Sequence, residues 1–132
     1  MNAPRYEGFL PGTHLLDGYR AGGFHFGGMS HRGSILALPS GIYAWDAGDF
    51  ESLGVEDFRR VIDEPKGAVE LLLVGTGEFL RPLPRAIRMA LNATGIRVDV
   101  MATHHAVPTY NLLLGERRKV AAALLTTPPG PA

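Results

Sequence analysis

The sequence contains no cysteine among its 132 residues, and its 13 basic and 13 acidic side chains leave no net charge. The absence of cysteine excludes disulfides, thiolate catalysis and cysteine-ligated metals, and it fits a reducing compartment. The balanced charge excludes a long-range field that would draw the whole molecule to nucleic acid or to an anionic membrane. A partner must therefore be recognised by a local surface.

Long apolar runs are also missing, because no segment approaches the roughly 20 residues that a membrane-spanning helix needs. The opening stretch, Met1 to Arg5, shows neither the apolar core of a secretory signal nor an Arg-rich amphipathic presequence. The composition, 45% apolar and 20% charged, is typical of a globular protein. A chain of 132 residues is too short for two ordinary domains, so we expect one cytoplasmic domain with a single core.

The second half of the chain predicts a parallel sheet. Segments 69–74 and 120–125 are apolar at almost every position, as in strands that are covered on both faces. Between them, the segment 82–84 begins a helix that Gly95 ends, and apolar residues alternate over 96–101 as in a further strand. A strand, a helix and a strand within about 30 residues predict a right-handed parallel crossover.

Two further helices are expected on either side of this unit. Apolar residues recur at helical spacing over 55–62, and acidic residues occupy the first turn, where they suit the amide end of a helix. The last helix is expected over about 107–114. Pro108 lacks an amide hydrogen and is tolerated only near a helix start, and Gly115 breaks the pattern.

The first half of the chain is rich in glycine and aromatic residues, which predicts short strands separated by turns. We expect strands over 24–26, 34–38 and 42–45. Residues 1–20 are expected to form a loosely ordered N-terminal segment, residues 21–125 a single domain, and residues 126–132 a proline-rich C-terminal tail.

Several motifs together resemble a known family of small domains of unknown function, whose members include a mitochondrial respiratory complex I assembly factor and an adipogenesis-associated protein. The residues that carry the resemblance are Leu71 to Gly77, Pro82 to Pro84, Gly95, Ile96, Val98, Val100, Met101, Thr103, Thr109 to Asn111, Leu113, Glu116, Arg117 and Val120 to Leu124. The resemblance spans residues 20–125 and implies an α/β fold, a three-layer single domain around a central mixed β-sheet. It implies little chemistry, because most members have no assigned activity.

The turn Gly75-Thr76-Gly77 is the first candidate ligand site. It follows a predicted parallel strand, and ligands of open α/β sheets bind at the carboxyl ends of such strands. Free amides in a glycine turn form an anion-binding nest. The segment is neither a Walker loop nor a dinucleotide fingerprint, since no Gly-Lys-Ser/Thr and no third glycine follow. The alternative is a tight turn in which the glycines serve backbone geometry alone.

Four residues complete the candidate ligand-binding set: Thr103, Tyr110, Asn111 and Arg117. The group from Tyr110 to Arg117 could return to the edge of the sheet at the glycine turn, where Arg117 would offer its guanidinium to a carboxylate or phosphate. The alternative is structural. In that interpretation Tyr110 packs under the sheet with its hydroxyl satisfied, and Asn111 bonds a neighbouring loop.

Metal and catalytic sites are not expected. His104 and His105 are adjacent, so their side chains diverge, and no ligand spacing or orienting carboxylate accompanies them. Arginines at 81, 85 and 88 share one helical face, but such a run usually marks a solvated surface. We therefore expect no cofactor, no metal and no nucleic-acid partner.

Two hypotheses of function remain open. The first is a noncatalytic binding or assembly-factor-like module that presents a rigid α/β surface to a protein partner, with homo-oligomerisation left open. The second is a small domain that binds an anionic metabolite, or acts on it, at residues 75–77. A cleft at residues 75–77 lined by the side chains of Tyr110, Asn111 and Arg117 would favour the second hypothesis, and a filled turn would favour the first.

Overall fold

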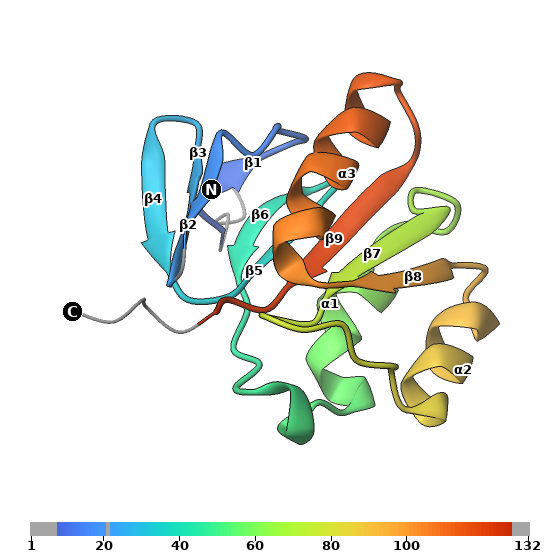
Figure 1. Cartoon of the computed structure of the whole chain (residues 1–132). Coiled ribbons are helices and arrows are strands. Elements are labelled where there is room, and N and C mark those ends of the chain that lie inside the picture. The colour runs from blue at the N-terminus through green and yellow to red at the C-terminus, as the bar shows by residue number, and fades with distance from the viewer. Residues whose placement is uncertain (1–7, 21, 128–132) are drawn as a thin grey trace, which may run out of the picture.

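The computed structural model describes residues 8–20 and 22–127. In chain order its elements are β1 (Leu10–Pro11), β2 (Gly18–Arg20), β3 (Gly23–Phe26), β4 (Met29–Arg32), β5 (Ile35–Leu38), β6 (Gly41–Ala44), the 3-10 helices η1 (Phe50–Ser52) and η2 (Val55–Phe58), α1 (Arg59–Ile62), β7 (Leu71–Gly75), α2 (Arg85–Ala93), β8 (Arg97–Met101), α3 (Thr103–Gly115) and β9 (Val120–Leu124). A six-stranded sheet has the order β1-β6-β5-β9-β7-β8, and β2, β3 and β4 form a second sheet (Figure 1).

Helices cover both faces of the six-stranded sheet, so the fold has three layers (Figure 1). On one face, α1, α2 and η2 pack against alternate strand residues such as Leu72 and Val74. On the other face, α3 and the three-stranded sheet pack against the intervening strand residues, such as Leu73. The predicted three-layer α/β fold around a central mixed sheet is confirmed.

The two strands predicted to be central, β7 and β9, lie side by side and parallel in the middle of the sheet. β8 pairs with the other edge of β7, also in parallel, which confirms the predicted strand-helix-strand crossover. All residues of β9 are buried, because one face of the strand contributes to each core. β9 also pairs in antiparallel fashion with β5, so it joins the two halves of the chain.

The predicted start of the last helix is wrong. α3 begins at Thr103, and Pro108 lies inside it. The carbonyl of Ala102 accepts hydrogen bonds from the amides of His105 and Ala106, both at 3.0 Å, which starts the helix well before the proline. Pro108 has no amide hydrogen to donate to the His104 carbonyl, four residues earlier. Both residues are exposed, so water can hydrate that carbonyl.

The N-terminal residues that the structure describes are tied to the domain by strand pairing. β1 pairs with β6, β2 pairs with β3, and Leu16 between them is 3% exposed. At the other end of the chain, Thr126 donates its amide to the Ser34 hydroxyl oxygen at 2.9 Å. Residues 1–7 and 128–132 lie outside the described residues, so a loose N-terminal segment and a tail remain predictions there.

Candidate binding site

The glycine turn lies where β7 ends, and its amides already donate hydrogen bonds within the protein. The Thr76 amide donates to the Met101 carbonyl at 2.9 Å, and the Gly77 amide donates to the Thr103 hydroxyl oxygen at 2.9 Å. The Thr103 amide in turn donates to the Gly77 carbonyl at 2.8 Å. The turn therefore does not offer the amides of Thr76 and Gly77 to an anion.

Thr103 is the centre of this arrangement. Its side chain is fully buried, and its hydroxyl donates to the Leu125 carbonyl at 2.7 Å while accepting from Gly77. One hydroxyl thus connects the end of β7, the start of α3 and the residue after β9. Gly75 is required beside it, because a Cβ at that position would lie 2.8 Å from the Thr103 Oγ1. Both features fix the position of the turn.

The turn contributes Thr76 and Gly77 to one wall of a cleft of ≈ 1010 Å³. The same wall continues through the loop that follows β7, as far as Arg81. The other walls are the three-stranded sheet, the residues around η1, and the segment 125–127 after β9. The carboxyl end of β7 therefore borders an open cleft, as expected for an α/β sheet.

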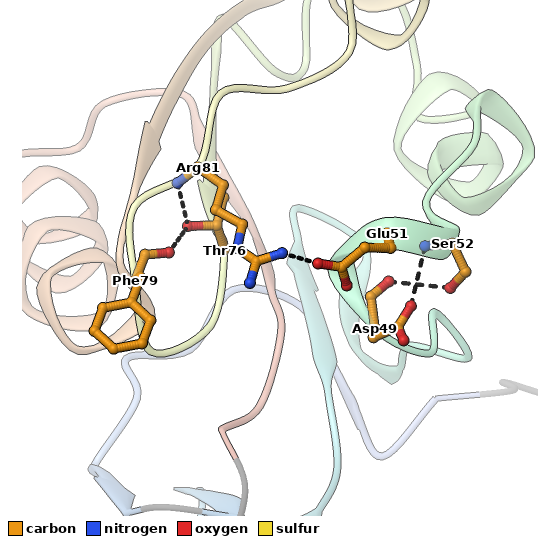
Figure 2. A network of polar contacts seen from close by, with 6 residues as sticks. All are labelled: Asp49, Glu51, Ser52, Thr76, Phe79 and Arg81. Atoms are coloured by element: carbon orange, nitrogen blue, oxygen red, sulfur yellow. Dashed lines mark hydrogen bonds and ion pairs between the residues drawn. The ribbon is translucent and has the colours of Figure 1, made fainter.

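A polar network holds the loop between β7 and α2 (Figure 2). The Thr76 hydroxyl donates to the Phe79 carbonyl at 2.6 Å and accepts from the Arg81 amide at 3.2 Å. The guanidinium of Arg81 forms an ion pair with Glu51 in η1. These contacts connect two walls of the cleft, and the Phe79 ring points away from the network (Figure 2).

The loop displays two consecutive large apolar side chains. Phe79 is 65% exposed and Leu80 is 64% exposed, although the backbone on either side is fixed by the hydrogen bonds of Thr76. Phe79 lines the cleft. An ordered loop that keeps two such residues in water is a candidate binding surface. Sequence reasoning missed both residues, although two apolar positions between a glycine turn and Pro82 were visible.

Tyr110 and Asn111 lie away from the cleft, on the side of α3 that faces the N-terminal segment. Asn111 accepts the Leu16 amide and donates to the Leu16 carbonyl, both at 2.8 Å. Tyr110 is 1% exposed, and its hydroxyl donates to the His14 carbonyl at 3.5 Å. Burial raises the pKa of Tyr110 to about 12. These are the contacts expected from the structural interpretation of both residues.

Arg117 lies at the end of the sheet opposite the glycine turn. In the register of β7 and β9, Leu71 pairs with Val120 and Gly75 pairs with Leu124, and Arg117 precedes Val120. Arg117 is exposed and has a φ of 61° in the turn after α3. The structure thus brings together Gly75, Thr76, Gly77 and Thr103, and it places Tyr110, Asn111 and Arg117 elsewhere. Ligand binding by this set stays a prediction.

The two adjacent histidines lie on the exposed face of α3, with their ring centroids 4.0 Å apart. Within residues 8–20 and 22–127, no group of three or more His, Cys, Asp or Glu side chains could hold a metal ion. The arginines do not gather at the glycine turn either. Arg81 is paired with Glu51, and Arg88 donates to the Val98 carbonyl at 3.3 Å.

Comparison with known proteins identifies the family. Residues 16–125 match the family described as protein of unknown function (DUF498/DUF598). The chain belongs to this family. It is 36% identical to an uncharacterized protein of Rhodobacter capsulatus over 96% of this chain and 94% of that protein. It is 31% identical to the human NADH dehydrogenase [ubiquinone] 1 alpha subcomplex assembly factor 3, over 87% of this chain but 62% of the human protein.

A solved structure supports the fold. A Bartonella henselae protein, described as an outer membrane protein, is 44% identical and superposes with a TM-score of 0.85 over 90% of this chain and 99% of its own. The family match and the human relative confirm the expected relationship to a respiratory complex assembly factor, and the chain spans less than two thirds of that human protein. In the described part of this chain, no helix has both the length and the apolar character needed to span a bilayer.

Proposed function

We propose that this protein is a noncatalytic binding module of the assembly-factor type, and that the Phe79-Leu80 pair on the rim of the cleft is its protein-docking surface. The observation that carries the proposal is the exposure of these two side chains, 65% and 64%, on a loop fixed by internal hydrogen bonds. Relatives named as assembly factors for NADH dehydrogenase support a protein as the partner.

The energetics favour this use of the loop. Burying a Phe or Leu side chain that is otherwise exposed is worth about 1.5–3 kcal/mol, so the pair supplies a substantial part of a specific interaction. The ion pair between Arg81 and Glu51 lies beside the apolar pair and forms a polar rim. The anchored loop loses little conformational freedom on binding, because the Thr76 hydrogen bonds already fix its backbone.

The alternative site for an anionic metabolite at residues 75–77 remains a prediction. Two of its amides donate within the protein, so no described contact favours it over protein binding. The proposal also keeps the cytoplasmic location expected from the sequence, which cell fractionation would test. Homo-oligomerisation is a further prediction, which light scattering of the purified protein would test.

The test is a quantitative pull-down with tagged protein from native lysate, followed by mass spectrometry. The double variant Phe79→Ser/Leu80→Ser should lose the proteins that the wild type retains. Met89→Ser/Leu112→Ser is the matched control, because the two residues are 56% and 63% exposed but lie on α2 and α3. Thermal melts should show that both variants remain folded. Equal recovery of every partner by the double variant and the wild type would contradict the proposal.

A further inference from the structure

The exposed face of the three-stranded sheet carries a row of two arginines with a glycine between them. In the strand register, Arg20 of β2 pairs with Gly23 of β3, and Gly23 pairs with Arg32 of β4. Paired residues point to the same face, and neighbouring strands are about 4.8 Å apart, so the two Cα atoms lie roughly 10 Å apart. The two guanidinium groups therefore emerge on one side of the sheet.

Gly23 keeps the space between the arginines open. A Cβ at this position would come within 2.8 Å of the His31 carbonyl, so a larger residue would not fit without a backbone shift. The next row of the same face pairs His25 with Ser30, which adds two polar side chains beside the arginines. All of these residues line the ≈ 1010 Å³ cleft.

Neither Arg20 nor Arg32 is held in an ion pair among the described residues. By contrast, Arg59 is paired with Glu56 and Arg81 with Glu51. Two such guanidinium groups on one wall suit a ligand with carboxylates. Each guanidinium can bind a carboxylate through two parallel hydrogen bonds.

The walls formed by the loop after β7 and by the residues around η1 carry more acidic than basic side chains. They carry Asp49, Glu51 and Glu78, of which Glu51 is paired with Arg81 and Asp49 accepts the Ser52 amide at 3.0 Å. These walls repel carboxylates and suit backbone amides and apolar groups, and they include Phe79. A ligand in the cleft must therefore present its acidic groups to the sheet and its apolar groups to the loop.

We infer that the cleft binds an acidic, extended segment of the protein partner. In an extended chain, alternate side chains point to opposite sides, and residues i and i+2 are roughly 7 Å apart on one side. Two acidic residues at that spacing can reach Arg20 and Arg32, while the apolar residue between them points to the other side, toward Phe79. A volume of ≈ 1010 Å³ is at the upper end for a small-molecule pocket and accommodates such a segment. This inference rests on the proposed function and names the chemistry of its partner.

The probe is the blocked peptide acetyl-Glu-Leu-Glu-Leu-amide, titrated into ¹⁵N-labelled protein at constant ionic strength. We expect saturable shifts of the Gly23, His25 and Ser30 amides. The matched peptide acetyl-Gln-Leu-Gln-Leu-amide should bind about tenfold more weakly or worse, because it lacks the charge-assisted hydrogen bonds. Equal binding of the two peptides, or no saturable shift, would overturn the inference.

The double variant Arg20→Gln/Arg32→Gln should weaken binding of the acidic peptide by about tenfold or more. Arg118→Gln/Lys119→Gln is the control, because it also removes two positive charges, from exposed positions near the opposite end of the sheet, and should leave the affinity unchanged. An unchanged affinity in the double variant would refute the role of the arginines. Tighter binding of single-stranded DNA or of phosphatidylglycerol vesicles than of the peptide would also refute it, in favour of a phosphate-bearing partner.

The pull-down separates this inference from the proposed function. If Arg20→Gln/Arg32→Gln retains the partner while Phe79→Ser/Leu80→Ser loses it, protein docking stands and the acidic-segment inference falls. If both variants lose it, both conclusions are supported. If the Phe79 and Leu80 variant retains the partner, the proposed function falls, whatever the arginine variant does.

Discussion

Replacing Thr103 by valine should destabilise the protein out of proportion to the size of the change. Valine has nearly the same shape as threonine, so packing around this fully buried side chain is kept. The change removes one hydroxyl, which accepts from the Gly77 amide at 2.9 Å and donates to the Leu125 carbonyl at 2.7 Å. Both hydrogen bonds are buried, and both backbone groups would lose this partner.

The expected loss follows from these two contacts. A buried donor or acceptor that is left unsatisfied costs about 1–3 kcal/mol, so the two groups together predict a loss of about 2–6 kcal/mol in the free energy of unfolding. The control Thr103→Ser keeps the hydroxyl and removes only a methyl group, which should cost about 1 kcal/mol. The loss expected for Thr103→Val is a large fraction of the roughly 5–15 kcal/mol that stabilises a typical domain.

Urea denaturation at equilibrium would measure both variants, with the transition midpoint and its slope compared to the wild type. The Gly77 amide resonance should shift in Thr103→Val and stay near its place in Thr103→Ser. A loss below about 0.5 kcal/mol in Thr103→Val, within the range of ordinary surface substitutions, would refute the bridging role of the hydroxyl.

Three further predictions follow from the packing. Leu72→Ala and Leu124→Ala should each cost about 2–5 kcal/mol in denaturant melts, because both side chains are fully buried and their removal leaves cavities. Gly75→Ala should lower the transition midpoint, since its Cβ would lie 3.1 Å from the Thr103 Cα, whereas Gly115→Ala has nothing within 4 Å and should not. Burial raises the pKa of Tyr110 from 10.0 to about 12, so the unfolded chain loses this proton first. Stability should therefore fall as the pH rises from 10.0 to about 12, and Tyr110→Phe should remove that part of the pH dependence.

The central strands could be predicted from the sequence because their environment leaves a clear pattern. β7 and β9 lie between two cores, so their apolar residues do not alternate, and segments 69–74 and 120–125 show this directly. β4 was not predicted, because Met29 to Arg32 is a mostly exposed, polar strand that is specified by its pairing with β3. Such pairing carries little signal in one sequence.

The placement of Arg117 shows how a single error in one element changes a predicted site. The expected helix over 107–114 was too short to show at which end of the parallel strands the chain would emerge. With 13 residues, α3 spans roughly 20 Å and carries the chain from the carboxyl ends of the parallel strands back to their amino ends. The start and the end of α3 therefore lie at opposite ends of the sheet, which keeps Arg117 away from the glycine turn.

The row of Arg20, Gly23 and Arg32 could not be found from the sequence for a related reason. The three residues come from three strands, and only the register of two turns places them in line. One residue more or less in either turn would move an arginine to the buried face, where Phe24 and Phe26 lie. The spacing along the chain does not reveal that alignment.

The position of β9 between β5 and β7 also determines the order in which the protein can fold. β9 follows the other five strands of its sheet in the chain, and its pairs with β5 join Ile35 to Leu124, so the six-stranded sheet cannot be completed until β9 has been made. Contacts so distant in sequence carry a loop-closure cost that slows folding. Until β9 arrives, the facing edges of β5 and β7 are open to pairing with other chains, and the nascent protein is at its most prone to aggregate.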